Sequence, residues 1–287
     1  MTTLANLRIG FIGYGKLARA LAWNYVDAGL TVTGASNGTH SDIPDHSLPP
    51  SCINFQSLEE LLQAVDLIFI TSPDSEISTI SDSLSWSPEH IVVHCSGTLE
   101  SSILNHAETQ GAKTGIFHPL QTVSKTQNLE NYIGIFTSVT FGITSRFESV
   151  RNTLSQLSTL LDGCWINIAD EMKTPYHIAA VMACGHITTL LELSNSIMTK
   201  AGLTRLESTE ALKTIVNTTI DNYFVQGASS LTGPAARHDK TTVLRHIDWL
   251  RENDPSILET YANLTRHSTQ MISNRDDASS TQMQEDQ

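Results

Sequence analysis

The residues with the clearest chemical potential form the run Gly13-Tyr14-Gly15-Lys16-Leu17-Ala18, close to the start of the chain. This run fits the dinucleotide pattern G-x-G-x-x-G/A. Gly13 permits a tight turn, Gly15 lets the backbone approach a pyrophosphate, and Ala18 lets the following helix pack closely on the preceding strand. The unpaired N–H groups at the helix start, together with the helix dipole, favour phosphate. The run therefore predicts a dinucleotide site made of these six residues; the alternative is a turn kept only for packing.

The residues after the second predicted strand bear on which dinucleotide binds. An NAD site usually places Asp or Glu there, about 20 residues after the glycines, to bind the ribose 2′-hydroxyl. This chain has Ser36, Asn37 and Thr39 instead. These small polar residues leave space for a 2′-phosphate and do not repel it, so they are predicted ligands and NADP is favoured over NAD. The loop carries no arginine to clamp the phosphate, and the alternative is a surface turn built on Asn37-Gly38.

Polar residues also follow two later strands. Ser72-Pro73-Asp74 comes after the apolar run at 66–70, and Ser96-Gly97 comes after the run at 90–94. In open α/β sheets ligands bind in the crevice beyond the carboxyl ends of the strands. We therefore expect all five residues to contact the cofactor at the same edge as the glycine turn.

Three side chains are candidates for catalysis. His118 can exchange a proton near neutral pH; its alternative is a structural hydrogen bond to backbone. His177 shares a helix face with Lys173, a spacing that loosely resembles the Lys-x-x-x-Asn pair of hydroxyacid dehydrogenases. Tyr176 points about 100° away from His177, so only one of the two is expected to face the cleft, with Tyr176 in the core. Ser96 would bind the nicotinamide amide or the substrate, or else simply form a turn.

Substrate binding is predicted for His118, Gln121, His177 and Arg237. Arg237 follows a Gly-Pro turn and would hold a carboxylate through two hydrogen bonds if it faces the cleft, whereas Asp239 is expected to cap a helix. The chain has 11 histidines, but none shows the pair spacing of a zinc site, so no metal is predicted.

Alternating strands and helices position these residues. Such alternation predicts an α/β, doubly wound Rossmann sheet over residues 1–169. The predicted strands begin near 8, 30, 52, 66, 90, 115, 135 and 164, and the predicted helices cover 17–28, 58–64, a stretch from 75, and 147–161.

The second half changes character at Asp170. Helical periodicity covers 171–201, 207–226, 240–250 and 255–272, with no convincing strand. Residues 170–272 are therefore predicted to be an all-α domain for substrate binding and dimerisation. Residues 273–287 lack large apolar side chains apart from Met283, which predicts a disordered tail.

Composition narrows the class of protein. The formal net charge of −13 argues against nucleic-acid binding. No run of about 18 consecutive apolar residues occurs, so no membrane contact is expected, and the N-terminus has no secretory pattern. The 4 cysteines are widely spaced, which indicates a cytoplasmic protein with free thiols.

Several short strings carry a resemblance to a known family. They are His94-Cys95-Ser96-Gly97, His118-Pro119-Leu120-Gln121, Tyr176-His177-Ile178-Ala179-Ala180, and Leu231-Thr232-Gly233-Pro234 with Arg237, Asp239 and His246. Together with the glycine run and Ser72-Pro73-Asp74, they resemble a family of Rossmann-like oxidoreductases whose C-terminal helical domain is known only as a domain of unknown function. That family is distantly similar to pyrroline-5-carboxylate reductase, imine reductases and the 6-phosphogluconate-dehydrogenase group.

The resemblance covers residues 7–270 and implies an NADP-dependent reductase or dehydrogenase that dimerises with a second copy through its helical domain. It implies no particular substrate. Two positions depart from the family: Gly185 stands where Asn is usual, and His238 stands where Gly is usual. If that Asn binds substrate, Gly185 puts a shared substrate in doubt; the alternative is that the neighbouring His186 takes over its role.

The sequence thus predicts an NADP-dependent oxidoreductase that transfers a hydride to or from a C=N or C=O bond of a small metabolite. Two alternatives stay open. One is a non-catalytic sensor that binds the dinucleotide, and the other is a structural dimer with an empty pocket.

Overall fold

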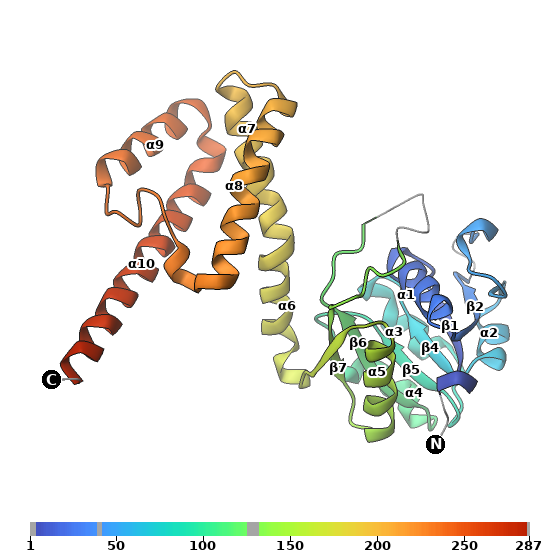
Figure 1. Cartoon of the computed structure of the whole chain (residues 1–287). Helices are drawn as coiled ribbons and strands as arrows, with labels where there is room; N and C mark the ends of the chain where they lie inside the picture. Colours follow the sequence, from blue (N-terminus) through green and yellow to red (C-terminus); the bar gives the residue numbers. More distant parts are fainter. Residues whose placement is uncertain (1–3, 39–41, 125–131, 286–287) are drawn as a thin grey trace. The chain divides into compact units, whose positions relative to one another are not determined.

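The computed structural model describes residues 4–38, 42–124 and 132–285. The chain divides into two compact units, residues 1–184 and 185–287 (Figure 1). The first unit therefore includes Asp170 to Cys184, which the sequence assigned to the helical domain.

One eight-stranded sheet forms the centre of the first unit, with strand order β3-β2-β1-β4-β5-β6-β7-β8. Neighbouring strands are parallel except for β6 and β7, which are antiparallel. The order of the first six strands is that of a doubly wound sheet, which confirms the predicted fold class. The strands are β1 (Arg8–Ile12), β2 (Thr31–Ser36), β3 (Ile53–Asn54), β4 (Leu67–Ile70), β5 (Ile91–His94), β6 (Lys113–Pro119), β7 (Thr140–Thr144) and β8 (Cys164–Asn167).

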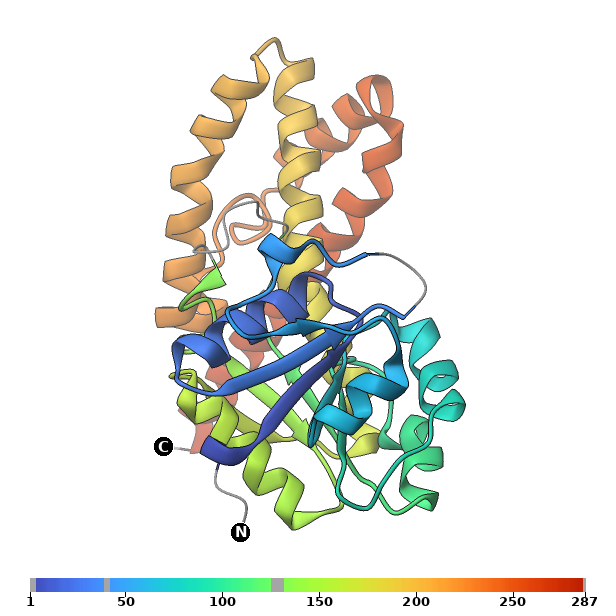
Figure 2. The same cartoon turned by 90° about the vertical axis from the view of Figure 1, so that its right-hand side faces the viewer.

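Helices cover both faces of this sheet, and the two-residue period of the strands decides which side chains meet which helices. On β4, Leu67 and Phe69 pack with α1 and α5, whereas Ile68 and Ile70 pack with α2, α3 and α4. Figure 2 shows the helices on the two sides of the sheet, with α1 in blue and α5 in yellow-green on one side and α2, α3 and α4 in light blue to green-cyan on the other. The helices are α1 (Lys16–Asp27), α2 (Leu58–Ala64), α3 (Asp74–Ser83), α4 (Asn105–Thr109) and α5 (Glu148–Leu160).

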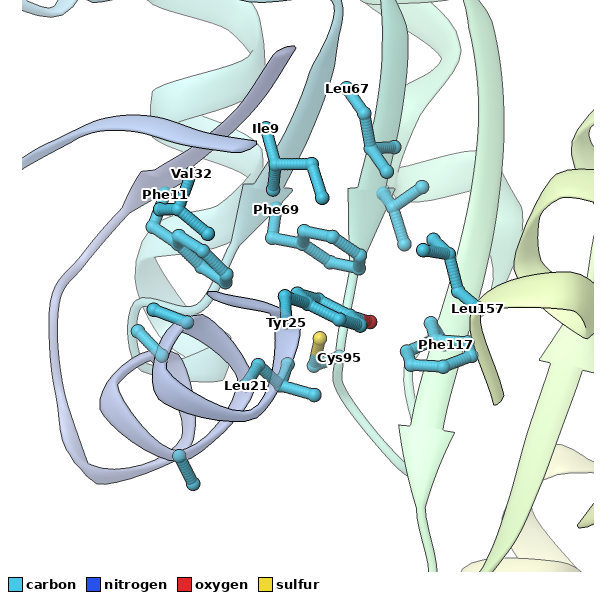
Figure 3. Close-up of a cluster of buried hydrophobic side chains, with 14 of the residues drawn as sticks. Ile9, Phe11, Leu21, Tyr25, Val32, Leu67, Phe69, Cys95, Phe117 and Leu157 are labelled. Atoms are coloured by element: carbon cyan, nitrogen blue, oxygen red, sulfur yellow. The ribbon is translucent and has the colours of Figure 1, made fainter. Parts of the chain in front are cut away.

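Aromatic rings fill the core beneath α1. The Tyr25 ring of α1 stacks on Phe69 of β4 at 6.0 Å between centroids, and Phe69 in turn lies 5.9 Å from Phe117 of β6 (Figure 3). This packing fixes α1 against the centre of the sheet. The glycine turn that precedes α1 is thereby held at the carboxyl end of β1.

Two predictions about this sheet were inaccurate. Strand β7 begins at Thr140 and not at Ile135, because residues 132–138 form turns in which Gly134 and Ser138 have φ of 74° and 62°, values that a strand does not allow. The short helix α4 was missed, since five residues carry too little periodicity to be recognised.

The long helix after the sheet begins in the first unit and continues into the second. It comprises α6 (Lys173–Val181), a π-helical segment (Met182–His186) and α7 (Ile187–Lys200). Helices α8 (Arg205–Gln226), α9 (Lys240–Asn253) and α10 (Pro255–Glu285) follow, and the described part of the second unit contains no strand. The Asp239 side chain accepts a hydrogen bond from the Thr242 N–H at 3.0 Å, which confirms it as the cap of α9.

Helix α10 extends to Glu285, beyond Ile272, where the sequence predicted the helix to end and a disordered tail to begin. Residues 273–285 contain neither glycine nor proline, so nothing in the sequence stops the helix. The end of α10 was therefore predicted too early. Residues 286–287 lie outside the described residues.

Candidate functional site

The glycine turn is held from two sides. Gly13 has φ of 84°, and a Cβ there would lie 2.6 Å from the Ser72 nitrogen, so only glycine fits. The Gly13 N–H donates to the Ser36 carbonyl at 2.9 Å, and the Tyr14 N–H donates to Asn37 Oδ1 at 2.6 Å. The loops after β2 and β4 thus set the shape of this turn.

Gly15 leaves the start of α1 open. A Cβ at this position would meet no heavy atom within 4 Å, and no side chain caps the helix. The first N–H groups of a helix have no partner inside it, so those of Lys16 and Leu17 can bind an anion. Ala18 is fully buried against the core, as close packing of helix and strand requires. These features fit a dinucleotide pyrophosphate.

A cavity of about 700 Å³ lies in front of this turn. Its size is in the range of small-molecule sites. Its walls come from the carboxyl ends of β1, β2 and β4 and from α1, α2 and α3. The lining residues are Ile12, Gly13, Tyr14, Gly15, Arg19, Asn37, Gly38, Asp42, Gln56, Ser57, Leu58, Glu59, Thr71, Ser72, Pro73, Glu76 and Ile80.

The predicted cofactor residues after β2 have different positions. Asn37 lines the cavity, whereas Ser36 is buried, does not line it, and accepts a hydrogen bond from the Gly38 N–H at 3.0 Å. Ser36 therefore shapes the loop. Thr39 lies outside the described residues.

Arg19 also lines the cavity, although it was not among the predicted site residues. A phosphate-binding arginine is expected in the loop after the second strand. Arg19 comes instead from α1, four residues after Gly15, and this spacing returns it to the helix face of Gly15. That periodicity was the available signal.

A second group of polar residues lies at the ends of β5 and β6. The Ser96 hydroxyl donates to Asp74 Oδ2 at 2.7 Å and accepts from the Thr98 and Leu99 N–H groups at 3.2 and 3.1 Å. The hydroxyl is thus engaged in joining the loops after β4 and β5. Because Ser72 and Pro73 line the cavity, the Asp74–Ser96 hydrogen bond connects the cavity rim to the histidines described next.

Gly97 lies between two imidazoles. A Cβ on Gly97 would come within 2.8 Å of His118 Nε2 and 3.0 Å of His177 Cε1. The His118 and His177 rings are 5.9 Å apart in an edge-to-face arrangement. His177 Nδ1 is buried without a hydrogen-bond partner in the described chain. The structure therefore brings together Gly97 and both predicted catalytic histidines.

Tyr176 belongs to the same group. Its hydroxyl and His118 Nδ1 share a hydrogen bond of 2.9 Å. The His118 ring contacts both Tyr176 and His177, and neither side chain lines the 700 Å³ cavity, so it stays a prediction that only one of the two faces the cleft. Burial, with the Lys173 charge as a smaller cause, lowers the pKa of His118 to about 4, so its imidazole is neutral at pH 7.

Lys173 is the buried cation of this group. It is 2% exposed, and its Nζ donates to the Ser96 carbonyl oxygen at 2.8 Å. Burial lowers the pKa of Lys173 to about 8, and the charges of Asp170, Cys95 and Asp74 oppose this shift. Asp170 itself accepts from the Ser101 N–H at 2.8 Å. The sequence placed Lys173 beside His177 but could not show its burial.

The remaining predicted site residues are held elsewhere. The Gln121 side chain is exposed and donates to the Ile135 carbonyl at 2.9 Å. Arg237 belongs to the second unit, in the turn before α9. Their substrate contacts stay predictions. In the ranges that the structure describes, no three His, Cys, Asp or Glu side chains lie close enough to hold one metal ion.

Two family models match the chain. A Rossmann-like domain covers residues 2–119, and a domain of unknown function, DUF2520, covers residues 139–268. The resemblance drawn from the sequence strings is thereby confirmed. No curated protein sequence matches.

Solved structures share the fold over nearly the full chain. A Bacteroides fragilis protein, provisionally named an NADP oxidoreductase, is 20% identical with a TM-score of 0.77, covering 93% of this chain and 100% of its own. A Thermotoga maritima protein is 21% identical with a TM-score of 0.69, covering 93% and 99%. A Plasmodium falciparum pyrroline carboxylate reductase with NADP bound is 14% identical with a TM-score of 0.62, covering 94% and 100%.

Proposed function

Because the chain belongs to the family that joins a Rossmann-like domain to DUF2520, we propose that it is an NADP-dependent reductase of a C=N or C=O bond in a small metabolite. Bound NADPH would supply a hydride to the substrate carbon and become NADP⁺, while the substrate nitrogen or oxygen gains a proton. The structural neighbours that are named as NADP-binding oxidoreductases support this proposal.

The chain's own residues would hold the cofactor in the 700 Å³ cavity. The glycine turn and the N–H groups of Lys16 and Leu17 bind its pyrophosphate. Asn37 lies on the side of the adenosine ribose, since the ribose lies near the end of the second strand in this fold. Ser72 and Pro73 lead from the cavity toward Gly97 and the histidines, where the substrate would bind.

The buried Lys173 ammonium carries the proposal. It reaches from α6 to the Ser96 carbonyl, just after the end of β5. Proton transfer is most effective when the pKa of the donor lies near the working pH, and the pKa of Lys173 is lowered to about 8. Lys173 Nζ would hold the proton that passes to the substrate. The His118 imidazole is neutral, and with His177 it would orient the substrate by hydrogen bonds.

Thermal unfolding with NADPH, NADP⁺ or NADH tests the cofactor half of this proposal. A ligand at about 100 times its dissociation constant adds about 2.7 kcal/mol of stability, and we expect this shift with NADPH and NADP⁺. Turnover is then measured as NADPH oxidation with a panel of imino and keto acids. A thermal shift without any turnover would favour the sensor, and no shift with any dinucleotide would favour the structural dimer.

We also propose that a second copy of the chain covers the exposed apolar faces of α7 and α8. Only Ser208 is buried among the 22 residues of α8, and Phe224 and Val225 are 81% and 83% exposed. The helical stretch 170–200 contains an 18-residue window that is apolar enough to cross a membrane, with a mean hydropathy of 1.2, and no part of that 18-residue window is buried. The ionisable side chains of His177, His186 and Glu192 lie inside this helical stretch, which disfavours a bilayer and favours a protein partner.

Replacing Phe224 and Val225 together by glutamate should convert this dimer to a monomer. Two charges buried at an apolar interface would cost several times the roughly 1.4 kcal/mol that changes a dissociation constant tenfold. Sedimentation velocity measures the mass. Ile53→Glu is the matched control, because Ile53 is 54% exposed but lies on β3. A wild-type monomer would contradict the proposal.

A further inference from the structure

Arg19 lies beside the cavity and contacts the Tyr14 ring. Its backbone N–H donates to the Gly15 carbonyl at 3.1 Å, and its guanidinium lies over the Tyr14 ring at 6.0 Å from the centroid. The Tyr14 ring is buried, and its hydroxyl donates to the Ser47 carbonyl at 3.3 Å. This cation–π contact with an anchored ring favours a guanidinium position over the face of Tyr14.

The Tyr14 ring gives the guanidinium no hydrogen-bond acceptor of the kind its N–H groups need. Arg19 Nε is buried and makes no hydrogen bond, and Arg19 forms no ion pair with any described carboxylate. A buried donor without a partner is costly. Such a donor on the wall of a cavity indicates an anionic ligand that supplies the missing acceptor.

The pyrophosphate and the ribose 2′-phosphate of NADP are the two candidates for that anion. The pyrophosphate has its own donors in the N–H groups at the start of α1. Arg19 lies one turn further along α1 and lines the cavity together with Asn37 and Gly38, which follow β2. The 2′-oxygen of the adenosine ribose lies near the end of this strand in dinucleotide-binding folds.

From this placement we infer that Arg19 binds the 2′-phosphate and makes the site selective for NADP over NAD; the inference rests on the proposed function. Asp42, Glu59 and Glu76 also line the cavity, and carboxylates favour a 2′-hydroxyl over a phosphate. Arg19 is the one basic side chain among the described residues that line the cavity, so it is the group that can attract a phosphate there. The selectivity residue thus comes from the helix after the glycine turn.

Calorimetric titration of the full chain with 2′,5′-ADP, 5′-AMP, NADPH and NADH tests this inference. The wild type should bind 2′,5′-ADP more tightly than 5′-AMP. Loss of a charge-assisted hydrogen bond should weaken the affinity of Arg19→Met for 2′,5′-ADP and NADPH by about 10- to 100-fold. Its affinity for 5′-AMP and NADH should fall by less than about 3-fold. Lys113→Gln removes the same charge at the opposite, amino-terminal end of β6 and should change none of the four.

Equal losses for NADPH and NADH in Arg19→Met would overturn the inference, since Arg19 would then act on the pyrophosphate or on the fold. Undiminished preference for 2′,5′-ADP would overturn it as well. An unfolding midpoint measured without ligand identifies a folding defect, and Arg19→Gln then provides a second, more polar variant. If the wild type binds neither NADPH nor NADH, the proposed function itself fails, which is a distinct result.

Discussion

Gly15→Asp should abolish NADPH binding and leave the chain folded. A Cβ at this position meets no heavy atom within 4 Å, and φ is −82°, so aspartate fits without strain. Aspartate is also a favourable residue at the start of a helix, because its carboxylate accepts hydrogen bonds from the first N–H groups. Those N–H groups are the ones proposed to bind the pyrophosphate. The carboxylate would therefore occupy the phosphate site and repel the phosphate.

The measurement is the unfolding midpoint with and without NADPH. The wild type should gain about 2.7 kcal/mol at a ligand concentration 100 times its dissociation constant, and Gly15→Asp should gain nothing. Its midpoint without ligand should match the wild type or exceed it. Unchanged NADPH affinity in Gly15→Asp would mean that the cofactor does not bind at this turn.

Gly13→Ala is the contrasting control, two residues away in the same turn. Its φ of 84° is unfavourable for alanine, and the new methyl group would lie 2.6 Å from the Ser72 nitrogen. We expect a loss of about 1–3 kcal/mol in unfolding free energy even without ligand. The two variants thus separate a loss of binding from a loss of fold.

The fold was largely predictable because its signals are local. The run at 66–70 alternates between two buried faces, and the glycine turn connects a strand to a helix, so neither feature depends on distant residues. Ser36 shows where this reasoning stops. It occupies the position expected of a ribose ligand, yet it is buried and bonds to its own loop, because the last residue of a strand can face either way.

The candidate site was predicted less completely, since distant elements assemble it. Arg19 reaches the cavity from a helix and not from the loop where a phosphate ligand was sought. Tyr176 and His177 point in different directions along α6, yet the His118 ring contacts both side chains. The burial of Lys173 depends on the Ser96 loop, which is 77 residues away in sequence. No periodicity in the sequence encodes such contacts.

Lys173→Met should lower the rate of NADPH oxidation by about 10²- to 10⁴-fold, the usual contribution of a positioned proton donor. The donor must carry its proton, so the wild-type rate should fall as pH rises through about 8, the pKa to which burial lowers Lys173. The variant should lack this alkaline limb. NADPH affinity should be unaffected, because Lys173 does not line the cavity in front of the glycine turn.

The same pKa has a consequence for stability that needs no substrate. The folded chain releases the Lys173 proton near pH 8, whereas the unfolded chain keeps it up to its ordinary pKa of 10.5. Between these values the unfolded state binds more protons, so the free energy of unfolding should rise with pH by up to about 1.4 kcal/mol per unit. Lys173→Met should remove this rise, and Lys113→Met, a change to an exposed lysine, should keep it.

A purely structural Lys173, one that only ties the Ser96 carbonyl to α6, would give a different pattern. The variant would then change stability but retain the alkaline limb of the rate. That limb would need another group with a pKa near 8. Neither neighbour qualifies, because burial lowers the pKa of His118 to about 4 and raises that of Tyr176 to about 12. Loss of the limb in Lys173→Met would therefore assign the proton to Lys173 Nζ, whereas its persistence would place the proton donor outside this group of residues.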